Sequence, residues 1–428
     1  MDLTPLRRHR DFRLLFAAQF VSFLGGMVTY VALPFQMYQL TGSSLAVGLL
    51  GLAELLPLLV TAFVGGALAD SVDRRRLVIT AELGLAGGCG LLMLNAAREH
   101  PSVAALYVAA ALMSGLNGLQ RPSIDALTPR LVDKHEIPAA AALGGFRGSV
   151  GMILGPALGG LLAGTLGPVA AYAFNALTYV LAVLCFRAIR ALPAPANVEQ
   201  PSLERVREGF RYARSRQELI GTYVVDFVAM VFGMPLALFP ALSQSLGGPK
   251  VLGMLYAAPA VGALVASVTS RWTPRVRRHG LAVMIAAAVW GLAIVAFGFT
   301  SRLWPALVCL ALAGGADMVS GIFRMTLWNE TIPDGLRGRL AAIEMVSYMS
   351  GPLLGHVEAG GVAALFGVQA SVVSGGVLCV IGVLVCGALL PRFVGYDARV
   401  FHAGKPVRSE GSFATAAPSA AAPASSLD

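Results

Sequence analysis

Four charged side chains lie within stretches of sequence that are otherwise almost entirely apolar. Glu54, Asp226 and Asp317 are carboxylates, and Arg147 carries the guanidinium that is their obvious ion-pair partner. A charged residue inside a membrane span is costly unless it is paired or hydrated, so such residues often mark ion or substrate pathways. In a cavity that opens alternately to two sides of a membrane, a carboxylate can take up and release a proton. We therefore predict proton coupling at Asp226, Glu54 or Asp317, in that order, with a buried ion pair as the alternative for each.

A second set of side chains predicts a substrate cavity. Arg147 is a candidate for binding an anionic substrate rather than a carboxylate of the protein. Tyr30, Phe227 and Tyr348 supply aromatic surface that could line a cavity for an organic molecule. Aromatic residues also form belts at membrane interfaces, which is the alternative for these three.

Other charged residues in the apolar stretches are weaker candidates for coupling. Glu82 and Arg324 lie nearer the cytoplasmic ends of their predicted spans, so we expect structural or snorkelling roles for them. Glu344, His356 and Glu358 share the eleventh predicted span. We expect His356 to be a polar packing group rather than a proton relay.

The composition predicts a membrane protein. Of the 428 residues, 56% are hydrophobic and only 13% are charged, whereas soluble domains carry about 25% charged residues. Apolar runs of about 20 residues are long enough to cross a bilayer as helices. These runs do not alternate as the strands of a barrel would. The net charge of +9 does not indicate a nucleic-acid partner, because the basic residues lie in short loops.

We predict an all-α integral membrane fold with twelve spans in two six-helix pseudo-repeats around a central cavity. The expected domains are an N-terminal bundle (1–190), a linker with an amphipathic or merely solvated helix (191–216), a C-terminal bundle (217–392) and a disordered tail (393–428). The predicted spans are 12–38, 44–69, 77–97, 103–127, 138–166, 168–186, 219–242, 252–270, 281–299, 304–327, 340–366 and 368–390.

The distribution of basic residues predicts the orientation. The predicted external connections contain only Arg98, Lys250 and Arg302, and most other basic residues lie on the opposite side. Cytoplasmic loops are enriched in Lys and Arg. We therefore expect both termini to be cytoplasmic, which requires an even number of spans.

A short charged connection between the second and third spans predicts a tight helical hairpin at the membrane surface. It contains Gly66, Asp70, Arg74 and Arg75. The pattern resembles the signature loop of the major facilitator superfamily, except that Asp73 stands where a glycine is usual. The resemblance implies that these residues form a conformational gate.

A glycine-rich segment lies in the fifth span. Small residues at spacings of four allow close helix packing, and a proline inside a helix removes a backbone hydrogen bond and favours a bend. The segment resembles the fifth-helix motif of exporting members of the superfamily, and ordinary glycine packing is the alternative. Its residues are Gly151, Gly155, Pro156, Gly159 and Gly160.

Two of these motifs recur when the sequence is shifted by 196 residues. The segment 66–68 then aligns with 262–264, and Arg75 aligns with Arg271. The Gly-Pro-x-x-Gly segment 155–159 aligns with 351–355. Agreement at two places with one offset indicates duplication of a six-helix unit, an arrangement typical of transporters that work by alternating access.

A wider set of segments resembles the bacterial enterobactin (siderophore) exporter group and related drug efflux permeases. The resemblance covers roughly 10–391 and implies a proton-coupled antiporter that exports a siderophore-type metabolite or a drug. The alternatives are an importer of a small solute and a non-transporting sensor or scaffold. The segments are 12–20 with 32–34, 66–76, Arg147-Gly148 ahead of 156–160, 209–211, 255–258 and 333–339.

The sequence offers no motif for enzymatic chemistry. There is no phosphate-binding Gly-Lys-Ser/Thr loop, and the five cysteines lie in apolar runs without metal-ligand spacing. We expect no catalytic residues, cofactor or metal. The expected partners are a small-molecule substrate, protons and the lipid bilayer, and the expected state is a monomer.

Overall fold

The computed structural model describes residues 2–71, 73–190, 211–333 and 336–397, without the side chains of 63–71, 337–339, 341–343 and 345–346. Eleven helices in this described part are long and apolar enough to cross a membrane. The helix α14 (Arg337–Phe366) has 30 residues, a length of about 45 Å, and supplies the twelfth span. The predicted all-α fold with twelve spans is confirmed.

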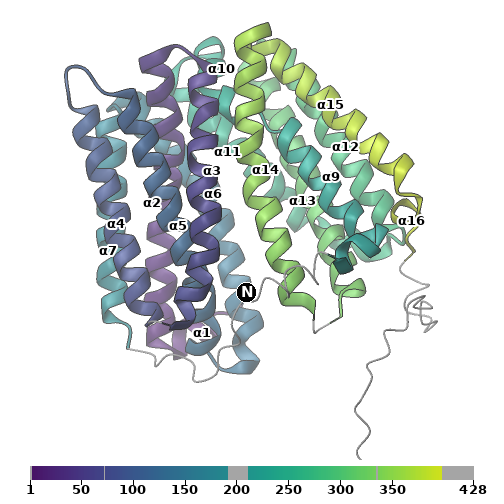
Figure 1. The fold of residues 1–428 in the computed structure, drawn as a ribbon, viewed down its shortest axis with the longest axis horizontal. Helices are drawn as coiled ribbons and strands as arrows, with labels where there is room; N and C mark the ends of the chain where they lie inside the picture. The colour runs from purple at the N-terminus through teal and green to yellow at the C-terminus, as the bar shows by residue number, and fades with distance from the viewer. Residues whose placement is uncertain (1, 72, 191–210, 334–335, 398–428) are drawn as a thin grey trace, which may run out of the picture.

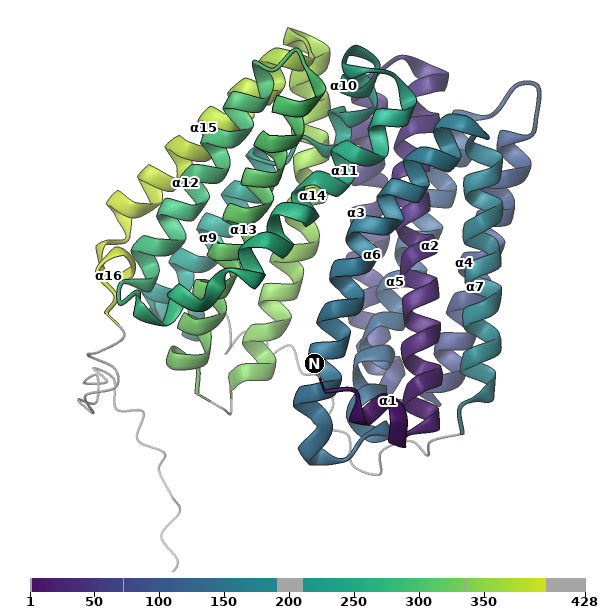
Figure 2. The same cartoon turned by 180° about the vertical axis from the view of Figure 1, so that it is seen from behind.

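The helices fall into two groups, which Figures 1 and 2 show side by side. The first group follows α1 (Thr4–Arg8) and contains α2 (Arg10–Thr41), α3 (Ser44–Ser71), α4 (Arg74–Ala96), α5 (Val103–Leu131), α6 (Ile137–Thr165) and α7 (Pro168–Ala188). The second contains α9 (Gln217–Phe232), α10 (Phe239–Leu246), α11 (Pro249–Val268), α12 (His279–Gly298), α13 (Leu303–Thr331), α14, α15 (Val368–Leu389) and α16 (Pro391–Val394).

Local sequence determines where several helices begin and end. Asp73 is the N-cap of α4, and its side chain accepts a hydrogen bond from the Arg75 backbone N–H at 2.9 Å. Ser102 caps α5 in the same way. Gly42 ends α2 with a φ of 61°, a left-handed conformation that glycine adopts without steric cost. Such signals explain why the predicted span ends lie within a few residues of the observed ones.

The seventh span differs from its prediction. The sequence predicted one helix over 219–242, but the structure breaks it after Phe232 and resumes with a short 3₁₀ turn and α10. The break contains Gly233 and Pro235, and the proline cannot donate a backbone hydrogen bond. Two side chains from neighbouring helices satisfy carbonyl groups that the break leaves without a helical partner. Trp290 Nε1 donates to the Gly233 oxygen at 2.7 Å, and Tyr256 Oη donates to the Leu236 oxygen at 3.1 Å.

The pseudo-repeat is visible in helix packing. In the first group α6 packs on α2, and Gly155 faces the side chain of Met27. In the second group α14 packs on α9, and Gly351 faces the side chain of Met230. The two glycines are the pair related by the 196-residue shift, so the repeated motif makes the same contact in both groups.

The two groups touch mainly through two helix pairs. At the end of the molecule opposite the N-terminus, α3 packs on α14 and α6 packs on α11 (Figure 2). Gly48 lies against Gly360 in the first pair, and Gly160 lies against Gly253 in the second. A Cβ atom at Gly160 would lie only 2.5 Å from the Gly253 Cα. Glycine at these positions therefore permits direct backbone contact between the groups.

Candidate functional site

A cavity of about 470 Å³ lies beneath these contacts and is lined by both groups of helices. The first group supplies most of its surface, and η2 (Leu236–Leu238), α11 and α14 supply the rest. Its charged and polar lining residues are Gln19, Ser22, Thr29, Tyr30, Glu54, Glu82, Ser114, Asn117, Gln120, Arg121, Asp125, Arg147, Tyr179, Tyr256 and His356.

Three residues that the sequence singled out for function lie in this one cavity. Glu54 reaches it from α3, Tyr30 from α2 and Arg147 from α6. The Tyr30 ring packs edge-on against the ring of Tyr256 across the two groups, with 5.6 Å between ring centroids. The cavity therefore combines a carboxylate, a guanidinium and an aromatic wall.

The other two aromatic candidates lie elsewhere. Neither Phe227 nor Tyr348 is among the described residues that line the cavity. Phe227 on α9 and Tyr348 on α14 are 37% and 52% exposed. Their place in a substrate pathway remains a prediction.

Asp226 and Asp317 belong to a separate charged group in the second half of the chain. Arg324 on α13 forms an ion pair with Asp226 on α9, and its Nη2 lies 3.7 Å from Oδ1 of Asp317. The side chains of Asp226 and Arg324 are 12% and 15% exposed, whereas that of Asp317 is 36% exposed. Asp226 is thus the more enclosed carboxylate of the two.

This charged group corrects one expectation. The partner of Asp226 is Arg324 and not Arg147, and the ion pair gives Arg324 a structural role, which is one of the two roles expected for it. Asp317 and Arg324 are seven residues apart, which is about two helical turns and places them on one face of α13. The spacing therefore allows the pairing of Asp317 with Arg324 to be predicted from the sequence. The pairing with Asp226 cannot be predicted in this way, because it depends on the packing of α9 against α13.

Glu82 and two residues of α5 also line the cavity, although the sequence analysis gave them no such role. Glu82 is 1% exposed and accepts hydrogen bonds from Ser22 Oγ at 2.9 and 3.1 Å. Arg121 and Asp125 lie one helical turn apart on α5. Their spacing of four residues could have indicated a shared role, because it places opposite charges on one face of the helix.

Three buried polar atoms of cavity-lining residues have no hydrogen-bond partner in the described part of the protein. They are Arg147 Nε, Gln120 Oε1 and His356 Nε2. Buried polar groups are nearly always hydrogen-bonded in folded proteins. These atoms are therefore available to water or to a bound molecule.

The signature loop is described only in part. The side chains of Gly66 and Asp70 lie outside the described residues, and Arg74 is the first residue of α4. The Arg75 guanidinium donates to the backbone oxygens of Phe186 at 3.0 Å and Arg187 at 2.6 Å, at the end of α7. A cation at this position satisfies terminal carbonyl groups and complements the helix dipole.

The glycine motif of α6 serves two interfaces. Gly151, Gly155 and Gly159 face α2 within the first group of helices. Gly160 instead faces Gly253 of α11 in the second group. One motif therefore packs α6 against its own group and also against the other group.

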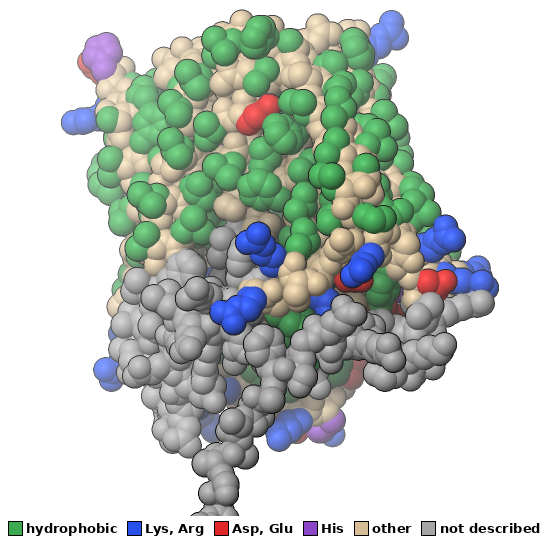
Figure 3. All heavy atoms as spheres, turned by 45° about the vertical axis from the view of Figure 1, so that its right-hand side comes forward, with side chains coloured by type: hydrophobic (Ala, Val, Ile, Leu, Met, Phe, Trp, Pro, Cys, Tyr) green, Lys and Arg blue, Asp and Glu red, His purple; other side chains and the backbone are tan. Residues whose placement is uncertain are grey.

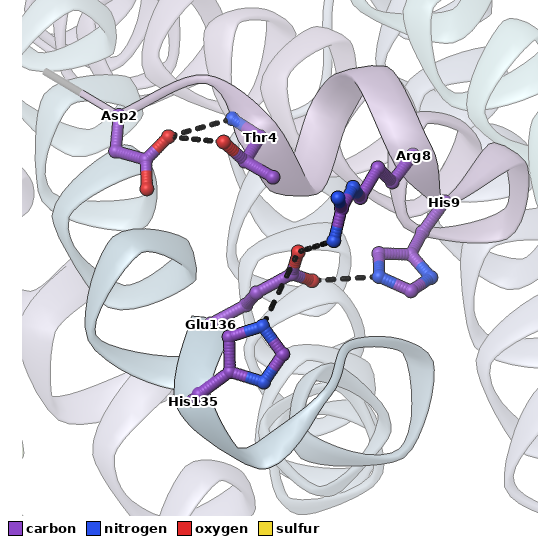
Figure 4. Close-up of polar contacts among 6 residues, drawn as sticks. All are labelled: Asp2, Thr4, Arg8, His9, His135 and Glu136. Atoms are coloured by element: carbon purple, nitrogen blue, oxygen red, sulfur yellow. Dashed lines mark hydrogen bonds and ion pairs between the residues drawn. The ribbon is translucent and has the colours of Figure 1, made fainter.

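A further charged cluster lies near the N-terminus, where η1 (Lys134–Glu136) precedes α6. Glu136 is surrounded by three basic side chains (Figure 4): its carboxylate lies 2.6 Å from His9 Nε2, 3.9 Å from Arg8 and 4.0 Å from His135. His9, Asp133 and Glu136 bring potential metal ligands within 4.8 Å of one another. The adjacent arginine opposes a divalent cation, so we interpret the cluster as an ion-pair network.

Comparison with known proteins places the chain among secretion proteins. A family model described as "Transmembrane secretion effector" matches residues 1–399. The enterobactin exporter EntS of Shigella boydii serotype 18 is 29% identical over 395 residues, which are 91% of this chain and 93% of that exporter. The enterobactin exporter EntS of Citrobacter koseri is 29% identical over 412 residues, 95% of this chain and 97% of that exporter.

Solved transporter structures share the fold at low sequence identity. A bacterial homologue of the human lysosomal transporter Spinster, in an inward-facing and unoccupied conformation, superposes with a TM-score of 0.73 at 15% identity and covers 90% of this chain and 98% of that one. The nucleoside transporter NupG superposes with a TM-score of 0.71 at 13% identity, covering 89% and 98%. At these identities the likeness concerns the fold alone.

Proposed function

The chain belongs to the transmembrane secretion effector family of major facilitator transporters, and we propose that it exports a small organic molecule across the bacterial inner membrane in exchange for protons. The observation that carries this proposal is the cavity between the two groups of helices, which contains carboxylates, arginines and aromatic rings. The relatives named as exporters favour export over import.

Alternating access is supported by the placement of the glycine contacts. The contacts of α3 with α14 and of α6 with α11 lie at the end opposite the N-terminus. With both termini in the cytoplasm, this end is external, and the described conformation opens inward. Figure 3 shows a face on which most Lys and Arg side chains lie below a broad hydrophobic band, toward the end that bears the N-terminus. That distribution agrees with the proposed orientation.

Substrate and proton sites lie in different halves in this proposal. The cavity, with Glu54 and Arg147, binds the substrate. The proton site is the group formed by Asp226, Asp317 and Arg324, and the Glu344 carboxylate of α14 also lies close enough to interact with this arginine. One arginine neutralises only one carboxylate, so a second carboxylate of the group is the natural carrier of a proton. Asp317 is the more exposed carboxylate and takes this role, while Asp226 keeps the ion pair.

The substrate class follows from the cavity and the relatives together. Arg121 and Arg147 suit the acidic oxygens of a siderophore-type metabolite. The same cavity contains Glu54, Glu82 and Asp125, which favour a cationic drug as the second candidate. We propose the metabolite as the principal substrate and a monomer as the working unit.

Transport in inside-out vesicles tests the function. With the lumen made acidic, we expect uptake of a catecholate siderophore to exceed uptake of a lipophilic cationic dye. We expect Arg147→Gln to abolish siderophore uptake, while Arg190→Gln, at an exposed position of the same half, leaves it unchanged. Uptake of the dye alone, sensitive to Glu54→Gln, would replace the metabolite by a drug. Uptake that is the same with and without the proton gradient would contradict antiport. If the folded protein took up neither probe, the sensor or scaffold alternative would be favoured.

A further inference from the structure

A second hollow lies on the outer surface of the second group of helices, away from the transport cavity. Its volume is about 770 Å³, and α11, α12 and α13 form its walls. Figure 2 shows these three helices on the side of the molecule turned to the viewer. Among the described residues that line it, only Thr269, Arg278 and the indole of Trp272 offer hydrogen-bonding or charged groups.

Small residues create the depth of this groove. Gly262, Gly315 and Ala316 allow α11 and α13 to pack so closely that their backbones form part of its lining. Larger apolar side chains stand at the rim, including Val265 at 58% exposed and Ile285 at 56% exposed. In a chain that spans a membrane, an open apolar groove of this shape borders the acyl chains of the bilayer.

Basic side chains gather at the end of the groove nearest the N-terminal face of the molecule. Arg271, Arg275, Arg277 and Arg278 are all exposed and lie within eight residues of one another, in η3 (Ser270–Arg275) and the turn before α12. No carboxylate in the part of the chain that the structure describes forms an ion pair with any of them. The ring of Trp272, which also lines the groove, packs against Phe323 with 5.9 Å between centroids.

The pseudo-repeat shows that this arrangement is specific to the second half. Arg75, the counterpart of Arg271 under the 196-residue shift, donates hydrogen bonds to the carbonyl groups at the end of α7. The neighbouring Arg76 lies 3.8 Å from the Asp73 carboxylate. The first half therefore engages Arg75 with its own backbone and Arg76 with Asp73, whereas the arginines of the second half form no such ion pair with a described carboxylate.

We propose that this groove is a binding site for one anionic phospholipid. One acyl chain lies between α11 and α12 on a floor formed by α13. The phosphate headgroup lies against Arg278 and Arg275, because arginine binds phosphate oxygens through charge-assisted hydrogen bonds. Basic pockets between membrane helices at a surface are a recognised form of lipid site. The proposal rests on the chain spanning a membrane and does not depend on which substrate it transports.

Tryptophan fluorescence tests the site directly, because Trp272 lines the groove and is 41% exposed. The full chain is reconstituted in phosphatidylcholine vesicles that contain a rising fraction of brominated phosphatidylglycerol or brominated phosphatidylcholine. The signal of Trp272 is the difference between the protein and its Trp272→Phe variant. We expect half-maximal quenching at a severalfold lower mole fraction of the anionic lipid.

Two matched variants separate the groove from a diffuse surface charge. Arg275→Gln with Arg278→Gln should remove the preference for the anionic lipid. Arg187→Gln with Arg190→Gln removes two exposed charges near the same membrane surface but in the other half, and should preserve it. Filling the groove by Ala266→Phe should reduce quenching by both lipids. Equal quenching by the two lipids in the unmodified protein, or equal loss of preference in both charge variants, would overturn the proposal.

Discussion

Arg324 on α13 forms an ion pair with Asp226 on α9, so the two helices are joined by charge within the second half of the chain. Both side chains are largely enclosed, and Asp317 lies on the exposed side of the same arginine. The two carboxylates are thus not equivalent, although both lie within membrane spans.

This difference predicts distinct phenotypes for two matched substitutions. Asp226→Asn leaves a buried guanidinium without its main partner, and removing one member of a buried pair costs about 3 kcal/mol or more. We expect a lower unfolding temperature in detergent together with lost transport. Asp317→Asn should fold normally, bind substrate and fail only in proton-driven accumulation.

Equilibrium binding and transport, measured on the same two variants, check this prediction. Counterflow exchange of labelled for unlabelled substrate without a proton gradient should persist in Asp317→Asn. Proton-driven accumulation that survives in Asp317→Asn would assign the proton to another carboxylate, with Glu54 the next to test.

The glycine contact between α6 and α11 predicts a conformational phenotype. A side chain at Gly253 would overlap the backbone of α6 near Pro156 and Ala157. Gly253→Leu should therefore separate α6 from α11 at the end of the molecule opposite the N-terminus. Spin labels at positions 166 and 250, in a cysteine-free background, should be farther apart in Gly253→Leu than in the protein that keeps Gly253, as measured by double electron–electron resonance. Gly90→Leu is the control, because a Cβ at Gly90 meets nothing within 4 Å, and it should leave the distance unchanged.

The break between α9 and α10 predicts a loss of stability. Trp290→Phe removes the donor to the Gly233 oxygen but keeps most of the buried ring. An unsatisfied buried carbonyl group costs about 1–3 kcal/mol. We expect a lower unfolding temperature and faster hydrogen exchange at 233–239. Exchange that stays as slow as in the unmodified protein would show that another group satisfies this carbonyl.

The contacts of Arg75 predict that a lysine cannot replace it. Its guanidinium reaches two backbone oxygens at the end of α7, whereas a lysine ammonium is a single point charge on a flexible stem. Arg75→Lys should therefore lower the unfolding temperature, while Arg76→Lys, whose side chain is 87% exposed, should not. Equal unfolding temperatures of the two variants would contradict a structural role for Arg75.

Much of the fold could be predicted from the sequence because hydropathy and loop charge report directly on membrane spans. The break in the seventh span was missed, since the residues from Gly233 to Leu238 are as apolar as the helices around them. Their irregular backbone depends on Trp290 and Tyr256, which come from other helices. Those two hydrogen bonds cannot be predicted from the pattern of apolar residues.

The candidate site was predictable in part for a related reason. The position of a charge along a span gives its depth, which was enough to place Glu54 and Arg147 at the level of the cavity that they line. It does not give the direction in which the side chain points, so Glu82 was assigned a structural role although it lines the cavity. The partner of Asp226 likewise depended on how α9 and α13 pack.

The cluster around Glu136 constrains the order of biogenesis. The contact between His9 and Glu136 joins residues that are 127 positions apart, so it cannot form until the ribosome has synthesised the residues that begin α6. The contacts of α1 with α2, including the bond from Arg13 to the Leu6 oxygen, can form early, whereas His9 must wait for Glu136 until the first four spans have been synthesised. A nascent chain halted before residue 136 should therefore leave the His9 side chain more open to chemical modification, and release of the halt should protect it.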